Sequence, residues 1–310
     1  MLCIDRQYMY YNIKEMLNIN DATPPAWLKE KIRLARKGDG GDKIRETNDL
    51  LSRLGLNTVC DSARCPNRNE CFSHHTATFL ILGDICTRAC AFCAVKHGHP
   101  SYPDTGEPIR LVHAASELGL SHIVITSVTR DDLEDGGSGH YATVIQSLRD
   151  FCPNVKIEVL VPDFNGAEDA MAKVLSAEPD IFAHNIETVP RLYSNIRPGA
   201  NYTRSLKLLS RAKRLFPDII TKSGIMLGLG ENKKEIQSTL SDLIKADCDM
   251  LTIGQYLSPS LAHAPVQRYV SEDEFIYWQK EAMALGFKSV ASGSLVRSSY
   301  KASLFFKEIQ

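Results

Sequence analysis

The chain has 310 residues, of which 44% are hydrophobic and 24% charged, and its formal net charge is −1. This composition is ordinary for a soluble globular protein, and the balanced charge argues against a generally basic surface for nucleic acid. No stretch reaches the roughly 20 apolar residues of a membrane span, and charged side chains interrupt residues 1–20, where a secretory signal would lie. We therefore expect a cytoplasmic protein with no nucleic-acid partner and no membrane partner.

Two helices are predicted within residues 1–75, which we interpret as an N-terminal extension. The first spans residues 27–37 and is basic and amphipathic. The second spans residues 43–54 and is followed by Gly55, a residue type that commonly ends helices. We expect both helices to lie against a larger body formed by the following residues.

Short apolar stretches alternate with amphipathic helical segments between residues 76 and 260. Helical crossovers between successive strands require a parallel sheet, and continuously apolar strands fit a sheet that is covered on both faces. No glycine-rich turn follows the first strand, so the alternation favours an α/β fold of the partial (β/α)6 TIM-type barrel kind. The expected strands are residues 77–82, 122–126, 156–161, 181–185, 219–226 and 250–255.

Residues 261–310 are predicted to form a C-terminal extension. It contains a helix over residues 271–285 and a short strand over residues 288–291 that is expected to extend the sheet. The chain then continues into a polar tetrapeptide, Arg297-Ser298-Ser299-Tyr300.

Polar residues follow the ends of the predicted barrel strands. Thr126 and Ser127 end the second strand, Asn185 and Glu187 follow the fourth, and Tyr256 follows the sixth. One such residue means little, because loops are polar in general. In barrels of this kind the chemistry lies at the carboxyl ends of the strands, so polar strand ends gathered at one rim predict a lined cavity.

Six of the nine cysteines lie between residues 60 and 93, in two groups of three. We name them the N-terminal triad (Cys60, Cys65 and Cys71, spaced C-x4-C-x5-C) and the loop triad (Cys86, Cys90 and Cys93, spaced C-x3-C-x2-C). Clustered spacing and an odd total argue against a disulfide framework and for metal binding in a reducing compartment. Three thiolates can hold three irons of a [4Fe–4S] cluster and leave one iron for another ligand. The sequence therefore predicts two [4Fe–4S] clusters.

An alternative for the loop triad is a structural zinc site completed by His97 or His99. The loop directly follows a predicted strand and is too tight for a zinc ribbon, which needs a second C-x2-C pair. This spacing favours the cluster over zinc.

The loop triad, with the aromatic Phe92 before its last cysteine, resembles the signature of the radical S-adenosylmethionine (SAM) superfamily. Its position after the first strand of a six-unit β/α run is similar to the partial barrel of that superfamily. The resemblance implies that the open iron chelates SAM and that a 5′-deoxyadenosyl radical is formed. By position, it also implies SAM contacts at Phe92, Thr126, Ser127, Asn185, Glu187 and Tyr256.

Further stretches are similar to the members of this superfamily that make lipoyl groups. In those enzymes an auxiliary [4Fe–4S] cluster is held by three cysteines and a serine oxygen, and the resemblance assigns these positions to the N-terminal triad and Ser299. A hard alkoxide is a poor match for a site of soft thiolates, which suits a cluster that is opened and consumed. The similar stretches are residues 60–67, 86–98, 126–128, 130–132, 135–137, 161–164, 184–191, 222–224, 228–231, 254–257 and 297–300.

The resemblance implies insertion of two sulfur atoms, at C6 and C8, into an octanoyl group bound to a lipoyl-carrier domain. The implied carriers are 2-oxoacid dehydrogenase E2 subunits and the glycine cleavage H protein, and the implied helpers are a ferredoxin- or flavodoxin-type reductant and a cluster-repair protein. A radical is required because an unactivated methylene C–H bond is beyond proton-transfer chemistry near neutral pH. The loop triad and Ser299 would carry the catalysis, and the auxiliary cluster would be sacrificed.

Two other functions remain open from the sequence. The first is a radical SAM enzyme of another reaction, whose auxiliary cluster only transfers electrons; the sulfide count after one turnover separates it from sulfur insertion. The second is a two-cluster electron carrier, which a SAM-dependent change in the cluster's EPR spectrum would exclude.

Overall fold

A computed structural model describes residues 23–38 and 41–307 of the chain. The expectation that residues 1–20 contain no secretory signal lies outside these ranges. Within them, no helix is both long enough and apolar enough to cross a membrane.

The core is an eight-stranded sheet with the order β1-β2-β5-β6-β7-β8-β9-β10. From β2 to β10 the neighbouring strands are parallel, whereas β1 is antiparallel to β2 at one edge. All six predicted strands are present, and β10 adds the predicted short strand after them. The bounds are β1 Asn57–Thr58, β2 Thr78–Ile81, β5 His122–Ser127, β6 Lys156–Leu160, β7 Ile181–Ala183, β8 Ile220–Leu227, β9 Met250–Gln255 and β10 Ser289–Gly293.

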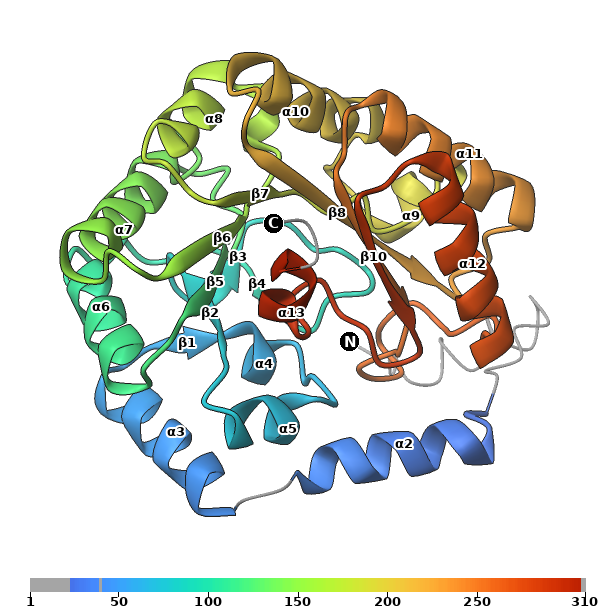
Figure 1. Ribbon diagram of the computed structural model, residues 1–310, viewed down its shortest axis with the longest axis horizontal. Coiled ribbons are helices and arrows are strands. Elements are labelled where there is room, and N and C mark those ends of the chain that lie inside the picture. Colours follow the sequence, from blue (N-terminus) through green and yellow to red (C-terminus); the bar gives the residue numbers. More distant parts are fainter. Residues whose placement is uncertain (1–22, 39–40, 308–310) are drawn as a thin grey trace, which may run out of the picture.

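Helices cover the outer face of this curved sheet, as in a partial TIM-type barrel (Figure 1). They form because one stripe of each helix is apolar and buries against the strands; in α11, for example, Ile236, Leu240 and Leu243 are fully buried. The bounds are α6 Glu107–Glu117, α7 Ser138–Phe151, α8 Glu168–Leu175, α10 Tyr202–Leu215, α11 Lys233–Lys245 and α12 Glu272–Leu285, with the short η1 Phe164–Gly166, η2 Pro190–Leu192 and α9 Tyr193–Ile196 between them.

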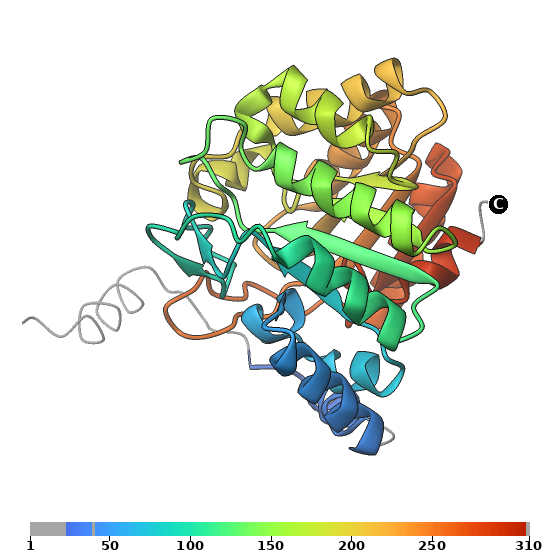
Figure 2. The same ribbon diagram turned by 90° about the vertical axis from the view of Figure 1, so that its left-hand side faces the viewer.

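The N-terminal helices lie on the side where the two edge strands, β1 and β10, do not meet (Figures 1 and 2). The predicted helices at 27–37 and 43–54 are confirmed as α2 and α3, and two short helices, α4 and α5, were not predicted. Helix α4 packs against β1 and β2, while α2 and α3 pack on α5. The bounds are α2 Ala26–Lys37, α3 Gly41–Arg53, α4 Val59–Ser62 and α5 Arg68–Ser73.

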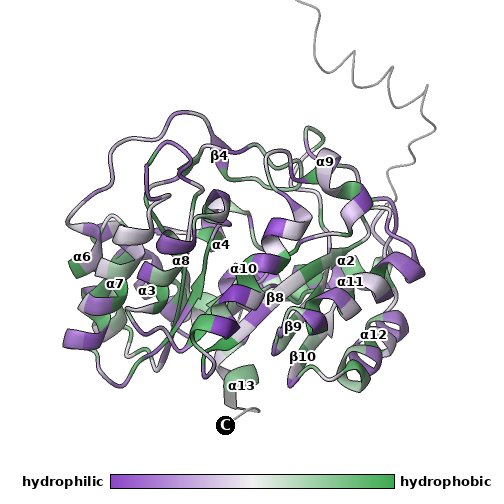
Figure 3. Ribbon diagram, turned by 90° about the horizontal axis from the view of Figure 1, so that it is seen from above, coloured by the Kyte–Doolittle hydropathy of each residue, from purple (hydrophilic) through white to green (hydrophobic). Residues whose placement is uncertain are grey.

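A C-terminal helix, α13 (Ala302–Lys307), lies at the end of the barrel opposite β4 (Lys96–His97) and α9 (Figure 3). Its Phe306 packs with Ile181 and Met250, the first residues of β7 and β9. The amino ends of the strands are therefore covered, and the carboxyl ends are left for a site.

A buried ion pair crosses the barrel interior. The Nζ atom of Lys222 on β8 lies 2.7 Å from an oxygen of Glu158 on β6, and both side chains are almost fully buried. His122 on β5 lies 3.5 Å from the other Glu158 oxygen. Burial would raise the pKa of Glu158, but the charge of Lys222 lowers it, so this carboxylate stays charged inside the core.

Candidate functional site

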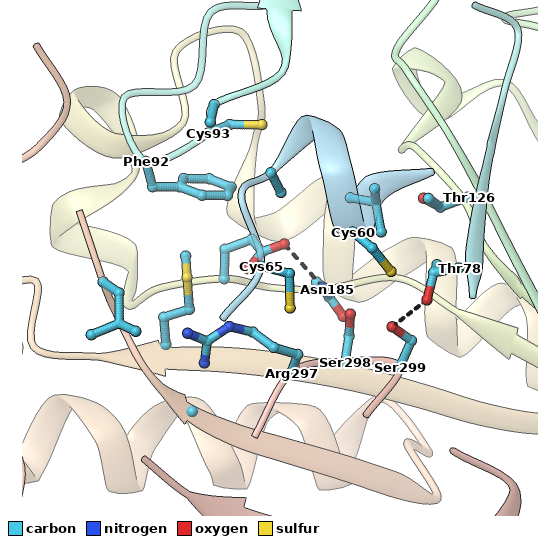
Figure 4. Close-up of a pocket in the computed structure, with 18 of the residues that line it drawn as sticks. Cys60, Cys65, Thr78, Phe92, Cys93, Thr126, Asn185, Arg297, Ser298 and Ser299 are labelled. Atoms are coloured by element: carbon cyan, nitrogen blue, oxygen red, sulfur yellow. Dashed lines mark hydrogen bonds between the residues drawn. The ribbon is translucent and has the colours of Figure 1, made fainter. Parts of the chain in front are cut away.

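A single cavity of about 700 Å³ contains every predicted site residue. It lies inside the barrel, with walls from strands β2, β5, β6, β8 and β9, the segments that follow several of them, the N-terminal helices and the C-terminal tetrapeptide. Figure 4 shows the two cysteine groups at different ends of this space, with Cys93 and Phe92 at one end and Cys60, Cys65 and Ser299 at the other. The predicted residues that line it are Cys60, Cys65, Cys71, Cys86, Phe92, Cys90, Cys93, Thr126, Ser127, Asn185, Glu187, Tyr256 and Ser299.

Backbone groups fix Cys86 at the start of the loop triad. A small parallel pair of strands, β3 (Ile85–Cys86) and β4, brackets the loop. The N–H groups of Arg88 and Thr129 donate to the Cys86 sulfur at 3.4 and 3.3 Å. These two bonds fix the position of the Cys86 sulfur at the start of the loop.

Arg88, inside the loop triad, ties the loop to the rim of the barrel. Its guanidinium donates to both oxygens of Asp131 at 2.7 and 2.8 Å and to Asp163 at 2.8 Å. Arg204 binds the second Asp163 oxygen at 2.8 Å. Burial would raise the pKa of Asp163, but Arg88 lowers it to about 2. The network holds the loop against the segments that follow β5 and β6.

The rest of the loop is held by main-chain bonds. The Ala91 N–H donates to Ile196 at 2.9 Å, and the Ala91 carbonyl accepts from Ala264 at 2.8 Å. Burial raises the pKa of the Cys93 thiol to about 12 and also raises the pKa of Cys90. Iron ligation must therefore displace protons from these thiols.

The geometry of the loop triad fits a cluster. All three cysteines are free, and their thiols act electrostatically on one another. A [4Fe–4S] cluster places each thiolate on a different iron, so three separate thiols around one cavity match it. Among the described residues, no three His, Cys, Asp or Glu side chains surround one ion position. His97 and His99, the zinc alternative, are exposed and lie outside the cavity lining.

Asn185 and Glu187 form a polar wall at the carboxyl ends of β7 and β8. The Asn185 amide donates to Glu187 at 3.1 Å, and its own carbonyl oxygen is buried without a hydrogen-bond partner among the described residues. Burial raises the pKa of Glu187, whereas the charge of Arg197 lowers it. A Cβ atom on Gly224 would come within 2.9 Å of the Asn185 oxygen, so the glycine keeps this wall accessible. An unpaired buried oxygen of this kind suits a polar ligand.

Arg197 is a site residue that the sequence did not reveal. It donates to the carbonyl of Asn185 at 3.0 Å and to Tyr193 at 2.9 Å, and its Nε atom is buried without a partner in the described structure. It lines the cavity and its charge acts on Cys90. A lone arginine in a loop carries no spacing signal, so only the fold identifies it.

The hydroxyl groups of Thr126 and Tyr256 both donate hydrogen bonds to main-chain carbonyls of the protein. Thr126 donates to the carbonyl of Leu160 at 3.0 Å, and Tyr256 donates to that of Ala264 at 2.7 Å. Both residues line the cavity. Because the Tyr256 hydroxyl is already bonded to Ala264, the aromatic ring is the part of this side chain left for a ligand. Phe92 is half-buried and packs against the core that includes Tyr256.

The N-terminal triad is built by the two short helices. Cys60 lies in α4, whose first turn is capped by Thr58, and Cys71 lies in α5. The Cys65 N–H donates to the Cys60 carbonyl at 3.0 Å, which folds the connecting turn. Burial raises the pKa of Cys60 to about 12. It also raises the pKa of Cys71, and the nearby thiols of Cys60 and Cys65 raise it further.

Ser299 is brought to this triad by three contacts of its segment. The Thr78 hydroxyl donates to the Ser299 oxygen at 2.7 Å (Figure 4). The Asn67 amide donates to the Leu295 carbonyl at 2.7 Å, and the Tyr300 hydroxyl donates to Glu70, the neighbour of Cys71, at 2.8 Å. The predicted fourth position is therefore in the same cavity as the three cysteines.

The comparisons with known proteins define the class first. Residues 80–243 match the family model of the radical SAM superfamily. Methylornithine synthase has a similar fold, with a TM-score of 0.52 and 17% identity over 81% of this chain and 77% of its own. The [FeFe]-hydrogenase maturase HydG of Carboxydothermus hydrogenoformans also has a TM-score of 0.52, at 14% identity over 97% of this chain and 82% of its own. Fold, cysteine loop and family match together define a radical SAM enzyme.

The sequence relatives are more specific. The lipoyl synthase of Caldanaerobacter subterraneus is 52% identical over 280 residues, which are 90% of this chain and 96% of the relative. That of Proteus mirabilis is 51% identical over 281 residues, which are 90% of this chain and 86% of the relative. The chain belongs to the lipoyl synthase family. It is a radical SAM sulfurtransferase that uses SAM, a [4Fe–4S] cluster and an auxiliary cluster.

Proposed function

We propose that this protein inserts one sulfur atom at C6 and one at C8 of an octanoyl group attached to a lipoyl-carrier domain. The observation that carries the proposal is that both triads and Ser299 line one cavity of about 700 Å³. A carbon radical made at one triad then needs no transfer through solvent to meet sulfur at the other.

Cys86, Cys90 and Cys93 would hold the SAM-binding cluster, with Arg88 and Thr129 fixing their loop. When bound, this cluster and SAM supply a 5′-deoxyadenosyl radical, which can remove a hydrogen atom from a methylene group. The protein would contribute the orientation of the bound groups.

Polar groups at the carboxyl ends of β7 and β8 would orient SAM. Asn185 and Glu187 offer oxygens for the ribose hydroxyls, and Arg197 places a positive charge beside Cys90, where the carboxylate of SAM would be neutralised. Phe92, Thr126, Ser127 and Tyr256 would complete the contacts, as expected from the sequence.

The auxiliary cluster would be the sulfur-donating substrate, held by the N-terminal triad and Ser299. The Thr78 hydroxyl already donates to Ser299, which is the direction of hydrogen bond that an alkoxide ligand requires. Apolar side chains that line the same cavity, among them Leu80, Val128 and Ile225, would provide a surface for an octanoyl chain.

The partners follow from this chemistry. The substrate would be an octanoylated carrier domain of a 2-oxoacid dehydrogenase E2 subunit or of the glycine cleavage H protein. A ferredoxin- or flavodoxin-type protein would supply electrons, and a repair protein would rebuild the consumed cluster in the cytoplasm.

The test is mass spectrometry of an octanoylated carrier peptide incubated with reconstituted enzyme, reductant and SAM. Wild type is expected to add two sulfur atoms and to lose auxiliary sulfide, whereas Cys65→Ala should cleave SAM without forming product. The matched control is Cys152→Ala, a half-buried free cysteine outside the cavity lining. Lipoyl product from Cys65→Ala, or a sulfide count unchanged after turnover, would contradict the proposal.

A further inference from the structure

Arg297 is placed beside the N-terminal triad without a carboxylate partner. It lines the cavity, and its Nη1 atom donates to the Val296 carbonyl at 2.7 Å. The Cys65 thiol lies close enough to act electrostatically on its guanidinium. Figure 4 shows the guanidinium beside Cys65, on the segment that carries Ser298 and Ser299. Among the described residues, no Asp or Glu forms an ion pair with it.

Two other buried arginines have carboxylates beside them. Arg88, inside the loop triad but outside the cavity lining, binds Asp131 and Asp163, and the charge of Glu187 acts on Arg197, which lines the cavity. A desolvated guanidinium is costly unless an anion compensates it. Because Arg297 lines the cavity and pairs with no carboxylate among the described residues, an anion bound in that cavity would compensate its charge.

We propose that Arg297 is the counter-charge of the auxiliary cluster and makes addition of an electron to that cluster more favourable. A cluster held by three thiolates and an alkoxide carries net negative charge. Attack of a carbon radical on one of its sulfides forms one carbon–sulfur bond and leaves one electron on the irons. A fixed positive charge stabilises that electron more than it stabilises the cluster before attack, because the interaction grows with the negative charge.

The inference rests on the proposed function, since it takes the N-terminal triad as the auxiliary site. The experiment therefore uses a chain in which the loop triad is replaced by alanine, so that the auxiliary cluster is observed alone. Iron and sulfide are counted first. The midpoint potential is then measured by EPR-monitored redox titration in this chain and in its Arg297→Met, Arg297→Lys and Arg36→Met derivatives. Arg36 lines the same cavity but is exposed to solvent, so its charge is screened.

Arg297→Met is expected to shift the reduction equilibrium against the reduced cluster by about tenfold or more, which is about 59 mV for one electron. Arg297→Lys and Arg36→Met should each shift it less than about threefold, because they keep the charge or change only a screened one. If Arg297→Met loses the cluster while Arg297→Lys keeps it, the positive charge is needed for assembly, which also supports the inference.

Two results would overturn this inference and leave the proposed function standing. The first is a midpoint potential in Arg297→Met equal to that of the parent chain. The second is loss of the cluster in both Arg297→Met and Arg297→Lys, which would mean that the shape of the side chain matters and not its charge. A parent chain that binds no iron overturns the proposed auxiliary site, and the inference falls with it. The iron count thus distinguishes the two failures.

Discussion

Thr78 and Ser299 are 221 residues apart in sequence, and their hydroxyl groups are 2.7 Å apart in the fold. Thr78 is the first residue of β2 and lies in register with Val124, in the middle of β5. The contact therefore places Ser299 inside the barrel and not above its rim. It connects the C-terminal tetrapeptide directly to the sheet.

Thr78→Val should weaken retention of the auxiliary cluster. The substitution keeps the side-chain shape and removes the donor to Ser299, and a hydrogen bond to a charged group contributes about 1.5–3 kcal/mol, or about tenfold or more. The measurement is the rate at which a chelator removes iron from a chain with an alanine-substituted loop triad. Thr78→Ser keeps the hydroxyl and serves as the control. Equal rates for Thr78→Val and its parent chain, which carries the same alanine-substituted loop triad, would show that the contact does not hold the ligand.

Arg88→Met should loosen the loop triad. It leaves Asp131 without a cation and buried Asp163 with Arg204 as its remaining cation, and loss of one partner of a buried ion pair costs about 3–5 kcal/mol. We expect iron at the loop triad to be lost to a chelator at least about tenfold faster. Arg191→Met, which breaks an exposed pair with Glu235, is the control and should leave the rate unchanged. The interpretation fails if both variants lose iron alike.

Lys222→Met should lower the free energy of unfolding by about 3–5 kcal/mol, because it leaves Glu158 charged in the barrel interior. Urea denaturation of the protein measures this change. Lys245→Met removes an exposed partner of Asp242 and should cost no more than about 0.5 kcal/mol. The double substitution Glu158→Leu and Lys222→Met should cost less than Lys222→Met alone. A Lys222→Met effect as small as that of Lys245→Met would contradict the buried ion pair.

His184 should make stability depend on pH. Burial lowers the pKa of His184 to about 4, and the ring is held by Val161 and Ser205 at 2.8 and 2.9 Å. The unfolded chain binds the proton near pH 6.5 and the folded chain only near pH 4, so stability falls as the pH drops between these values, by up to about 3 kcal/mol. His184→Asn should flatten this pH dependence of the unfolding free energy, whereas the exposed His113→Asn should keep it. A steep slope that survives in His184→Asn would assign it to other groups.

The sequence predicted the sheet well because each strand is a local apolar run. β9 has the predicted bounds, Met250–Gln255. The strand predicted at 181–185 ends at Ala183, and the chain rejoins the sheet through a bridge between Glu187 and Ile225. Helices α4 and α5 were missed because four and six residues carry too little periodicity for a prediction.

The site was predictable where its residues are close in sequence. The spacing of the loop triad indicated its chemistry without the fold, whereas the association of Ser299 with the N-terminal triad came from a family resemblance. Arg197 and Arg297 received no role, because a single charged residue has no pattern and acquires meaning through its neighbours in space. The cluster ligands and SAM contacts stay predictions that the proposed experiments test.

The separation of Thr78 and Ser299 in the sequence also determines the order in which the two cluster sites acquire iron. The loop triad spans eight residues, Cys86 to Cys93, so an unfolded or newly made chain can already offer iron three neighbouring thiolates. The auxiliary position is complete only when the barrel has formed and the segment around Ser299 has docked on β2, because closing so long a loop costs entropy that local contacts cannot repay. Iron supplied during folding should therefore fill the SAM-binding centre first, and the sulfur donor should be installed on a protein that is already folded.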